Sequence, residues 1–183
     1  MPSVLIPLAQ GCEELEAVTV IDLLRRAGIE VVTAGLDERP VVAARGTRLL
    51  PDTTLDDALR RDYDMVVLPG GQPGADNLDQ DQRIHALLRM MAGKDKFTAA
   101  ICAAPKVLAN AGLLSGRQAT GFPGVLEQMN LSDTRLTGAP VVKDGKVITS
   151  RGPGTAMDFA LELIELLAGT AKRNQVETAL QRP

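Results

Sequence analysis

The sequence predicts an α/β fold with a mainly parallel central sheet and helices on both faces. Short apolar runs alternate with segments whose apolar residues recur at helical spacing. Strands that alternate with helices pair in parallel, because each crossover helix returns the chain across a face of the sheet. Hydrophobic residues make up 45% of the chain and aromatic residues only 2%, so the core is expected to be aliphatic. No repeat or linker interrupts the pattern, and residues 1–183 are expected to form a single domain.

The expected elements follow from these patterns in chain order. Strands are expected at the apolar runs 3–8, 29–34, 65–68 and 97–101. Helices are expected at 13–27, 55–60, within 74–91, at 105–111, at 155–168 and in a last stretch to the C-terminus. In the first helix Leu15, Val18, Ile21 and Leu24 recur at helical spacing, and Gly28 follows its end.

Two further segments predict short strands. Residues 41–50 are expected to form a strand pair or an excursion, because Gly46 interrupts the run. Segments 135–142 and 146–150 flank KDG, a turn signal that predicts a small β-hairpin.

Composition excludes several classes of function. The net charge is −3 and charges of both signs are mixed along the chain, so neither nucleic-acid nor membrane-surface binding is expected. No run approaches the about 18 apolar residues of a membrane span, and the N-terminal apolar run lacks the basic start of a signal peptide. Two cysteines make a disulfide framework unexpected and favour a cytoplasmic location.

The single histidine, His85, restricts the chemistry further. It cannot supply a zinc site of ordinary composition, so no such metal site is expected. It lies in DQRIHALLRMM, a helical segment, and is interpreted as a surface or packing residue rather than a catalytic base.

Three loops are expected to meet at one edge of the sheet. AQGCEELE, LPGGQPGADN and ICAA each follow a predicted strand. Because sites in parallel sheets lie beyond the carboxyl ends of the strands, these loops form the candidate site.

Cys102 is the candidate nucleophile, since it stands between a strand and a helix. Such a turn exposes a side chain as a nucleophile elbow does, and the N–H groups of the following helix favour the thiolate. The alternative is a buried, inert strand cysteine. Gly70 and Gly71 end the neighbouring strand, and N–H groups of Gly71 and Ala103 could form an oxyanion hole. The alternative is a plain turn; no GK[ST] follows, so a phosphate loop is rejected.

Three acidic residues open the first helix. Glu13 and Glu14 are interpreted as solvated residues that complement the helix dipole. Glu16 lies on the apolar side and is expected to share one proton with Cys102, so that the pair titrates as a unit. Cys12, in the same loop, is either a resolving thiol near the site or an incidental small residue.

Five segments together resemble one family over nearly the whole chain. They are GCEELEAVTVIDLLRRAGI, YDMVVLPGGQPGADNL, AAICAAP, ATGFPG and KVITSRGPGTAMDFAL. The chain resembles the ThiJ/PfpI superfamily, and within it the bacterial YajL type, which is related to a human Parkinson-disease-associated branch. The resemblance implies a flavodoxin-like sandwich, a homodimer and no cofactor. It also implies Cys102 as an oxidisable nucleophile, Glu16 as its acid partner, and Arg45 near the dimer interface with Arg26 close by.

The activities that the resemblance implies are of two kinds. One is conversion of glyoxal-type aldehydes, or of their adducts on proteins and nucleotides, to hydroxy acids. The other is oxidative-stress protection with chaperone behaviour. Phe122 stands where the human branch has a histidine, so Glu16 would do all the acid–base work. The family's peptidases have a histidine directly after the cysteine, where this chain has Ala103, so a protease is not expected.

Three hypotheses therefore follow from the sequence. The first is a cysteine enzyme that acts on small reactive aldehydes or glycated adducts. The second is a non-enzymatic redox sensor or chaperone that works through oxidation of Cys102 to the sulfinic acid. The third is a scaffold with an inert buried cysteine.

Overall fold

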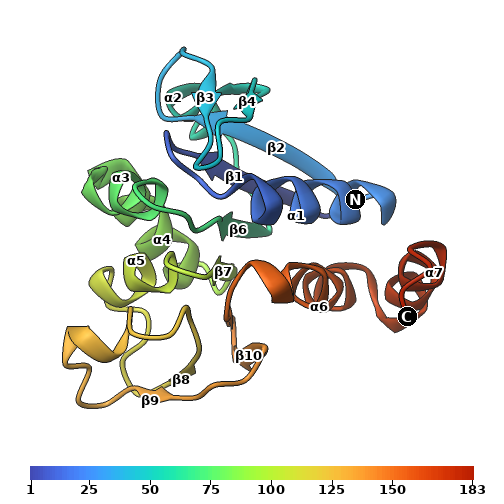
Figure 1. The fold of residues 1–183 in the computed structure, drawn as a ribbon. Helices are drawn as coiled ribbons and strands as arrows, with labels where there is room; N and C mark the ends of the chain where they lie inside the picture. Colours follow the sequence, from blue (N-terminus) through green and yellow to red (C-terminus); the bar gives the residue numbers. More distant parts are fainter.

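The computed structural model describes residues 1–183 and contains a seven-stranded sheet of order β10-β11-β7-β6-β1-β2-β5 (Figure 1). Neighbouring strands are parallel except for the antiparallel β10–β11 hairpin. The strands are β1 (Ser3–Leu8), β2 (Glu30–Gly35), β5 (Thr53–Thr54), β6 (Met65–Leu68), β7 (Phe97–Ile101), β10 (Val141–Asp144) and β11 (Val147–Ser150). The predicted mainly parallel sheet with a small hairpin is confirmed.

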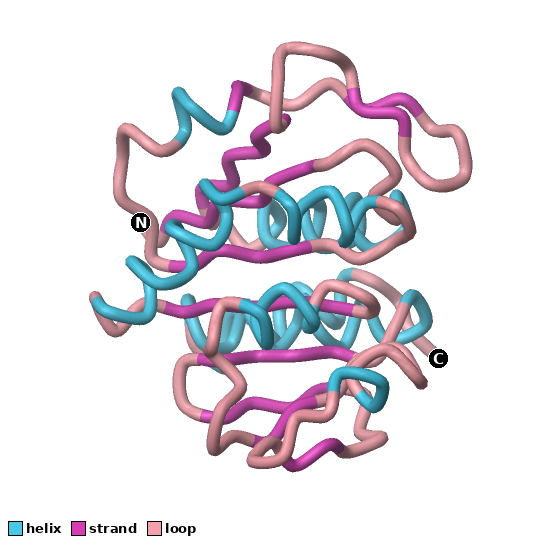
Figure 2. Tube along the Cα trace, turned by 90° about the vertical axis from the view of Figure 1, so that its left-hand side faces the viewer, coloured by secondary structure: helices cyan, strands magenta, loops and turns pink.

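Helices cover both faces of this sheet, because successive strand residues point to opposite sides. In β1, Val4 and Ile6 join one core cluster, whereas Leu5 joins the other. The first cluster also contains residues of α1 (Glu14–Arg26), α6 (Ala156–Ala168) and α7 (Thr170–Ala179). The second contains residues of α2 (Leu55–Ala58), α3 (Gly74–Gln80), α4 (Gln82–Gly93) and α5 (Pro105–Asn110). Figure 2 shows the strands one above another, with helices in front of and behind them.

Two additional two-stranded sheets lie outside the main one. The antiparallel pair of β3 (Val41–Val42) and β4 (Arg48–Leu49) confirms the strand pair expected in residues 41–50. The parallel pair of β8 (Gln118–Ala119) and β9 (Arg135–Leu136) was not expected. Residues 135–142 therefore do not form one arm of the hairpin, because 135–136 pair with β8 and only 141–144 pair with β11. Short 3₁₀ turns occur at Glu127–Met129 and Pro153–Thr155.

The helix expected within residues 74–91 is divided in two. Asp81 has extended backbone angles, φ −87° and ψ 111°, which end α3. Its carboxylate accepts a hydrogen bond from Arg83 N at 2.9 Å and so caps the start of α4. The break comes from this capping residue, which apolar spacing alone does not reveal.

Helix α1 is turned differently from the expected apolar stripe. Val20 and Leu24 are buried, but Leu15 and Val18 are 51% and 45% exposed. Glu16 occupies a fully buried position of the same helix. The sequence offers two apolar faces on α1, and packing against the sheet and α6 selects the one that carries Glu16.

The central strands place the three loops side by side. β1, β6 and β7 are adjacent and parallel, so residues 9–13, 69–73 and 102–104 emerge at the same edge. From β1 the chain goes to β2 on one side, and after β5 it crosses to β6 on the other side of β1, which makes this edge a topological switch point. None of the helices combines the length and apolar character that crossing a membrane requires.

Candidate active site

Cys102 lies immediately after β7 in a constrained backbone conformation. Its φ is +64°, in the left-handed region that residues other than glycine rarely adopt. Its N–H donates to Ser150 O at 2.9 Å, and its carbonyl accepts from Phe122 N at 2.8 Å. These two contacts hold the sharp strand-to-helix turn that the sequence predicts, at a cost of about 1–3 kcal/mol in backbone strain.

Glu16 lies beneath this turn, fully buried on α1. Its Oε2 accepts a hydrogen bond from Gly70 N at 2.8 Å. Its Oε1 is the only buried side-chain nitrogen or oxygen without a hydrogen-bond partner, and the Cys102 thiol interacts with the same carboxyl. A partnerless buried carboxyl oxygen is the natural position for a proton directed at the sulfur.

Gly70 allows the thiol and the carboxyl to come together. A Cβ at this position would lie 2.7 Å from Cys102 Cβ and 2.9 Å from Glu16 Oε2. Any larger residue would have to displace one of the two groups. The glycine that the sequence places at the end of β6 therefore serves close approach, and its N–H also binds Glu16.

Both titratable groups have raised pKa values, although the hydrogen bond from Cys102 acts against the rise in Glu16. Burial is the main cause that raises the pKa of Glu16 to about 7. Burial, followed by the charge of Glu16, raises the pKa of Cys102 to about 12. The N–H groups of Gly71 and Ala103 approach the sulfur and act against this rise, but burial and the Glu16 carboxylate outweigh them. The helix N-terminus alone therefore does not make Cys102 acidic, contrary to expectation.

A shared proton resolves this conflict of charges. When Glu16 is protonated, the negative charge that disfavours the thiolate disappears, and the acid can donate to the sulfur. When Glu16 is ionised, the thiol retains its own proton. With these pKa values the pair holds two protons below about pH 7 and one above it, and its titration as a unit stays a prediction.

A pocket of about 360 Å³ opens onto Cys102. It brings together five of the predicted residues, which are Cys102, Gly71, Ala103, Phe122 and Arg45. The remaining lining residues are Glu13, Ala44, Gln72, Val125 and Pro153. Gly70 and Glu16 lie next to Cys102 without lining the pocket. Arg45 lines the pocket of its own chain, and Arg26 pairs with Asp22 on α1.

Cys12 is fully buried and does not line this pocket. Burial is the main cause that raises its pKa to about 12, with the charge of Glu14 second. Its backbone is closely packed, since a Cβ on Gly74 would lie 2.5 Å from Cys12 Cα. These contacts favour the interpretation of Cys12 as a small packing residue over a resolving thiol.

Glu13 was wrongly interpreted as a solvated residue. Its side chain is only 12% exposed and lines the Cys102 pocket, whereas Glu14 is half-buried and accepts a hydrogen bond from Arg45 N at 2.9 Å. Glu13 and Glu16 are three residues apart, a spacing that places both at the same side of a helix start. That spacing is the sequence signal that could have identified Glu13.

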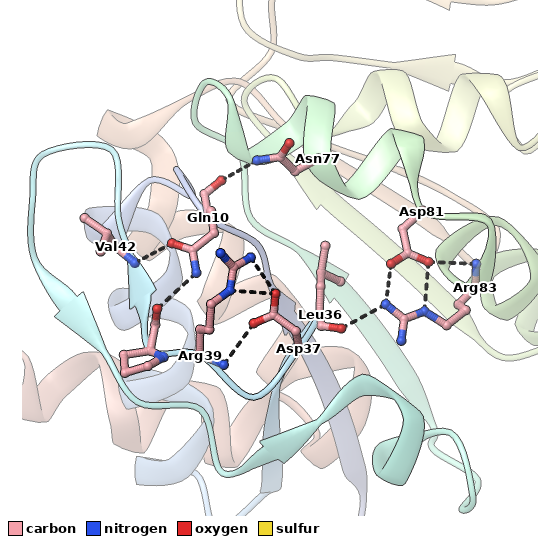
Figure 3. Close-up of polar contacts among 9 residues, drawn as sticks. Gln10, Leu36, Asp37, Arg39, Val42, Asn77, Asp81 and Arg83 are labelled. Atoms are coloured by element: carbon pink, nitrogen blue, oxygen red, sulfur yellow. Dashed lines mark hydrogen bonds and ion pairs between the residues drawn. The ribbon is translucent and has the colours of Figure 1, made fainter.

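The sequence does not identify Gln10 as a site residue, although its side chain anchors the first loop (Figure 3). Its Nε2 donates to Pro40 O at 3.0 Å, and its Oε1 accepts from Val42 N at 2.9 Å. Asn77 Nδ2 donates to the Gln10 carbonyl at 2.8 Å. Gln10 thereby ties the loop that carries Glu13 to β3 and α3. No local sequence pattern predicts this network, because its partners are far apart in the sequence.

His85 lies outside the site. Its side chain is 8% exposed, and Nε2 lies 2.7 Å from Asp79 O. It is a packing residue between α3 and α4, as the sequence analysis allows. No three side chains of His, Cys, Asp or Glu are grouped so as to hold a metal ion.

The raised pKa of Glu16 makes stability depend on pH. Its folded pKa of about 7 exceeds the reference value of 4.5, so its stabilising contribution is complete below pH 4.5 and is lost as the pH rises through 7. Relative to Glu16→Gln, the wild type should lose on the order of 3 kcal/mol of unfolding free energy between pH 4.5 and 8. Urea unfolding of both proteins across this range measures the difference. Glu14→Gln keeps Glu16 and should retain this loss, and parallel wild-type and Glu16→Gln curves would contradict the assignment.

Comparisons with known proteins identify the family of this chain. A profile of the DJ-1/PfpI family matches residues 2–166. The dj-1beta protein of Drosophila melanogaster is 43% identical over 179 residues, which are 97% of this chain and 96% of the fly protein. Its crystal structure has a TM-score of 0.94 and covers 100% of this chain and 98% of that one.

Two further relatives differ in what their names record. A Caenorhabditis elegans protein named glutathione-independent glyoxalase is 35% identical over 94% of this chain and 91% of its own. The structure of oxidised Toxoplasma gondii DJ-1 has a TM-score of 0.93 at 37% identity, with 98% of each chain covered. The narrower assignment to the bacterial YajL type stays a prediction. With this fold and these similarities over almost its full length, the chain belongs to the DJ-1/PfpI family, the superfamily predicted from its motifs.

Proposed function

We propose that this chain is a cofactor-independent cysteine enzyme that acts on glyoxal, methylglyoxal and their adducts on proteins or nucleotides. The observation that carries the proposal is the buried Cys102–Glu16 pair beside a pocket of about 360 Å³. Such a pocket is large enough for a small aldehyde or the end of a modified side chain. The name of the nematode relative supports aldehyde chemistry within the family.

The first step is addition of sulfur to the aldehyde carbon. The proton leaves the Cys102 thiol for Glu16, and the thiolate forms a C–S bond as the carbonyl electrons move to oxygen. The N–H groups of Gly71 and Ala103, which already face the sulfur, stabilise the resulting oxyanion. No external base is needed, because the pair holds the proton internally.

The second step moves a proton between adjacent carbons. Glu16 first gives the thiol proton to the oxyanion and becomes a carboxylate again. It then takes the proton from the former aldehyde carbon and returns it to the neighbouring carbonyl carbon, while the hydroxyl proton passes from the first oxygen to the second, which leaves a thioester on Cys102. Water then cleaves the C–S bond and releases a hydroxy acid, so methylglyoxal and water give lactic acid. A glycated amine would leave as the free amine. Phe122 has no titratable group, so Glu16 carries out every proton transfer.

Turnover of methylglyoxal tests this mechanism. Lactate measured by proton NMR should exceed one equivalent per wild-type protein. Cys102→Ala removes the nucleophile and Glu16→Gln removes the base, so either should lower the rate at least about 100-fold. Cys12→Ala is the matched cysteine control and should retain turnover. Full activity of Cys102→Ala would refute the mechanism.

The alternative is a redox sensor or stress chaperone. It is favoured by the open pocket above Cys102 and by the oxidised form known for the Toxoplasma relative. Peroxide would oxidise Cys102 stepwise to the sulfinic acid, each equivalent transferring one oxygen to sulfur and leaving as water. A protonated Glu16 would donate a hydrogen bond to a sulfinate oxygen.

Intact mass separates the two functions. A sensor should gain two oxygen atoms on Cys102 at low peroxide, with Cys12 unmodified because it is buried away from the pocket. The same preparation should produce no more than one equivalent of lactate. Oxidation of Cys12 before Cys102 would exclude the sensor.

We also propose that the chain is a homodimer that associates through α1. Leu15 and Val18 are three residues apart, half-exposed and on one face of the helix, which supports burial against a second copy. Light scattering should give twice the 19.4 kDa chain mass. Leu15→Arg should shift the protein toward the monomer, and a monomeric wild type would exclude this dimer.

A further inference from the structure

The pocket above Cys102 has an acidic wall that the proposed mechanism does not use. Glu13 lines the pocket with its side chain 12% exposed. It is the N-cap of α1, and its Oε1 lies 3.5 Å from Leu15 N. Its own N–H donates to Gly70 O at 3.0 Å, which ties the backbone of Glu13 to the loop after β6. The backbone of Glu13 is therefore held in place, and its carboxyl lies beside the start of α1.

A single basic group accompanies this acid in the pocket. Arg45 Nε lies 3.9 Å from Glu13 Oε2, and the Arg45 side chain is 80% exposed. Water and salt screen an exposed charge far more than a buried one. Although the two formal charges cancel, we expect the less screened Glu13 to give the inside of the pocket a negative potential. Glu16 adds a second negative charge below it whenever it is ionised, and no other basic side chain lines the cavity.

The opposite part of the lining is apolar. Phe122, Val125 and Pro153 line it, and Phe122 is 48% exposed, so its ring is accessible. Apolar groups lower the local dielectric and strengthen the field of Glu13. A carboxylate and an accessible aromatic ring in one small pocket are a combination suited to an organic cation, because both attract positive charge.

We propose that Glu13 determines specificity by charge, so that the pocket prefers cationic carbonyl compounds over anionic ones. This inference deepens the proposed function and rests on it for the reaction. The favoured substrates are dicarbonyl compounds that carry an ammonium or guanidinium group near the reacting carbon. Dicarbonyls that carry a carboxylate or phosphate are disfavoured, because Glu13 repels them from the position next to Cys102.

Charged thiol reagents test the pocket without requiring turnover. Trimethylammonioethyl and sulfonatoethyl methanethiosulfonate carry opposite charges and form the same kind of disulfide with Cys102. Their second-order rate constants, followed by intact mass in a Cys12→Ala background, are divided by those for the urea-unfolded protein. The normalised cation-to-anion ratio should exceed about ten and fall at least fivefold in Glu13→Gln.

Two variants keep this result interpretable. Glu13→Asp retains the charge and should retain the preference. Glu38→Gln removes the same charge from an exposed position outside the pocket and should leave the ratio unchanged. A ratio near one in the wild type, or one that Glu13→Gln does not change, would overturn the inference.

Turnover of three phenylglyoxals then separates this inference from the proposed function. The ring carries hydrogen, a para carboxylate or a para trimethylammoniomethyl group, and each substrate would give the corresponding mandelate. In the wild type kcat/KM should rank the cation first and the anion last, and Glu13→Gln should compress that range at least fivefold. If no substrate is turned over while the reagent preference depends on Glu13, the enzyme proposal fails and the charge selectivity stands. If all three are turned over with the same ranking in wild type and Glu13→Gln, only the role of Glu13 is overturned.

Discussion

The placement of a carboxyl group beside a thiol in a buried position is the constraint around which the rest of the site is arranged. Glu16 is fully buried, and a charge there would be costly unless it were neutralised or bonded. The fold provides one hydrogen bond from Gly70 and leaves one oxygen facing no nitrogen or oxygen partner. A proton shared with Cys102, as we propose, would satisfy both groups at once. Groups with strongly perturbed pKa values of this kind concentrate at functional sites, because stability alone does not favour them.

The parallel sheet makes this arrangement possible. β1, β6 and β7 end at the same edge, so three short loops deliver the acid, the glycine pair and the cysteine to one point. The strained turn at Cys102 persists because β11 and the segment after β8 each hold its backbone by a hydrogen bond. Gln10 has a corresponding role for the first loop, which it ties to β3 and α3. Rigid loops of this kind preserve the short distances on which the shared proton depends.

The same thiol is suited to two chemistries, and the surrounding pocket distinguishes them. Addition to an aldehyde needs oxyanion donors and a base that can transfer a proton between carbons, which are the groups that face the sulfur. Oxidation by peroxide needs only access and an acid that can bind the product. Phe122 lines the pocket but has no proton to transfer, and Glu13 lines it with a carboxyl group. In the proposed function, specificity depends on the residues that line the pocket, whereas reactivity depends on Cys102 and Glu16.

The sequence by itself determined the α/β class, the order of the central elements, the hairpin turn and the position of Cys102 after a strand. These features follow from local patterns, because strand and helix periods and turn residues act over a few positions. The pairing of Glu16 with Cys102 was also predictable, since an acid on the apolar side of a helix requires a partner.

Only the tertiary structure decided which faces and loops meet. α1 exposes Leu15 and Val18 and buries Glu16, although the apolar spacing allowed the opposite rotation. Glu13 belongs to the pocket because Arg45, Phe122 and other residues distant in the chain enclose it. Residues 135–136, which were expected in the hairpin, pair instead with residues 118–119. The physical reason is common to all three. Contacts between segments far apart in the chain decide how a helix is rotated, which strands pair and which residues line a pocket. A local sequence pattern does not reveal those contacts.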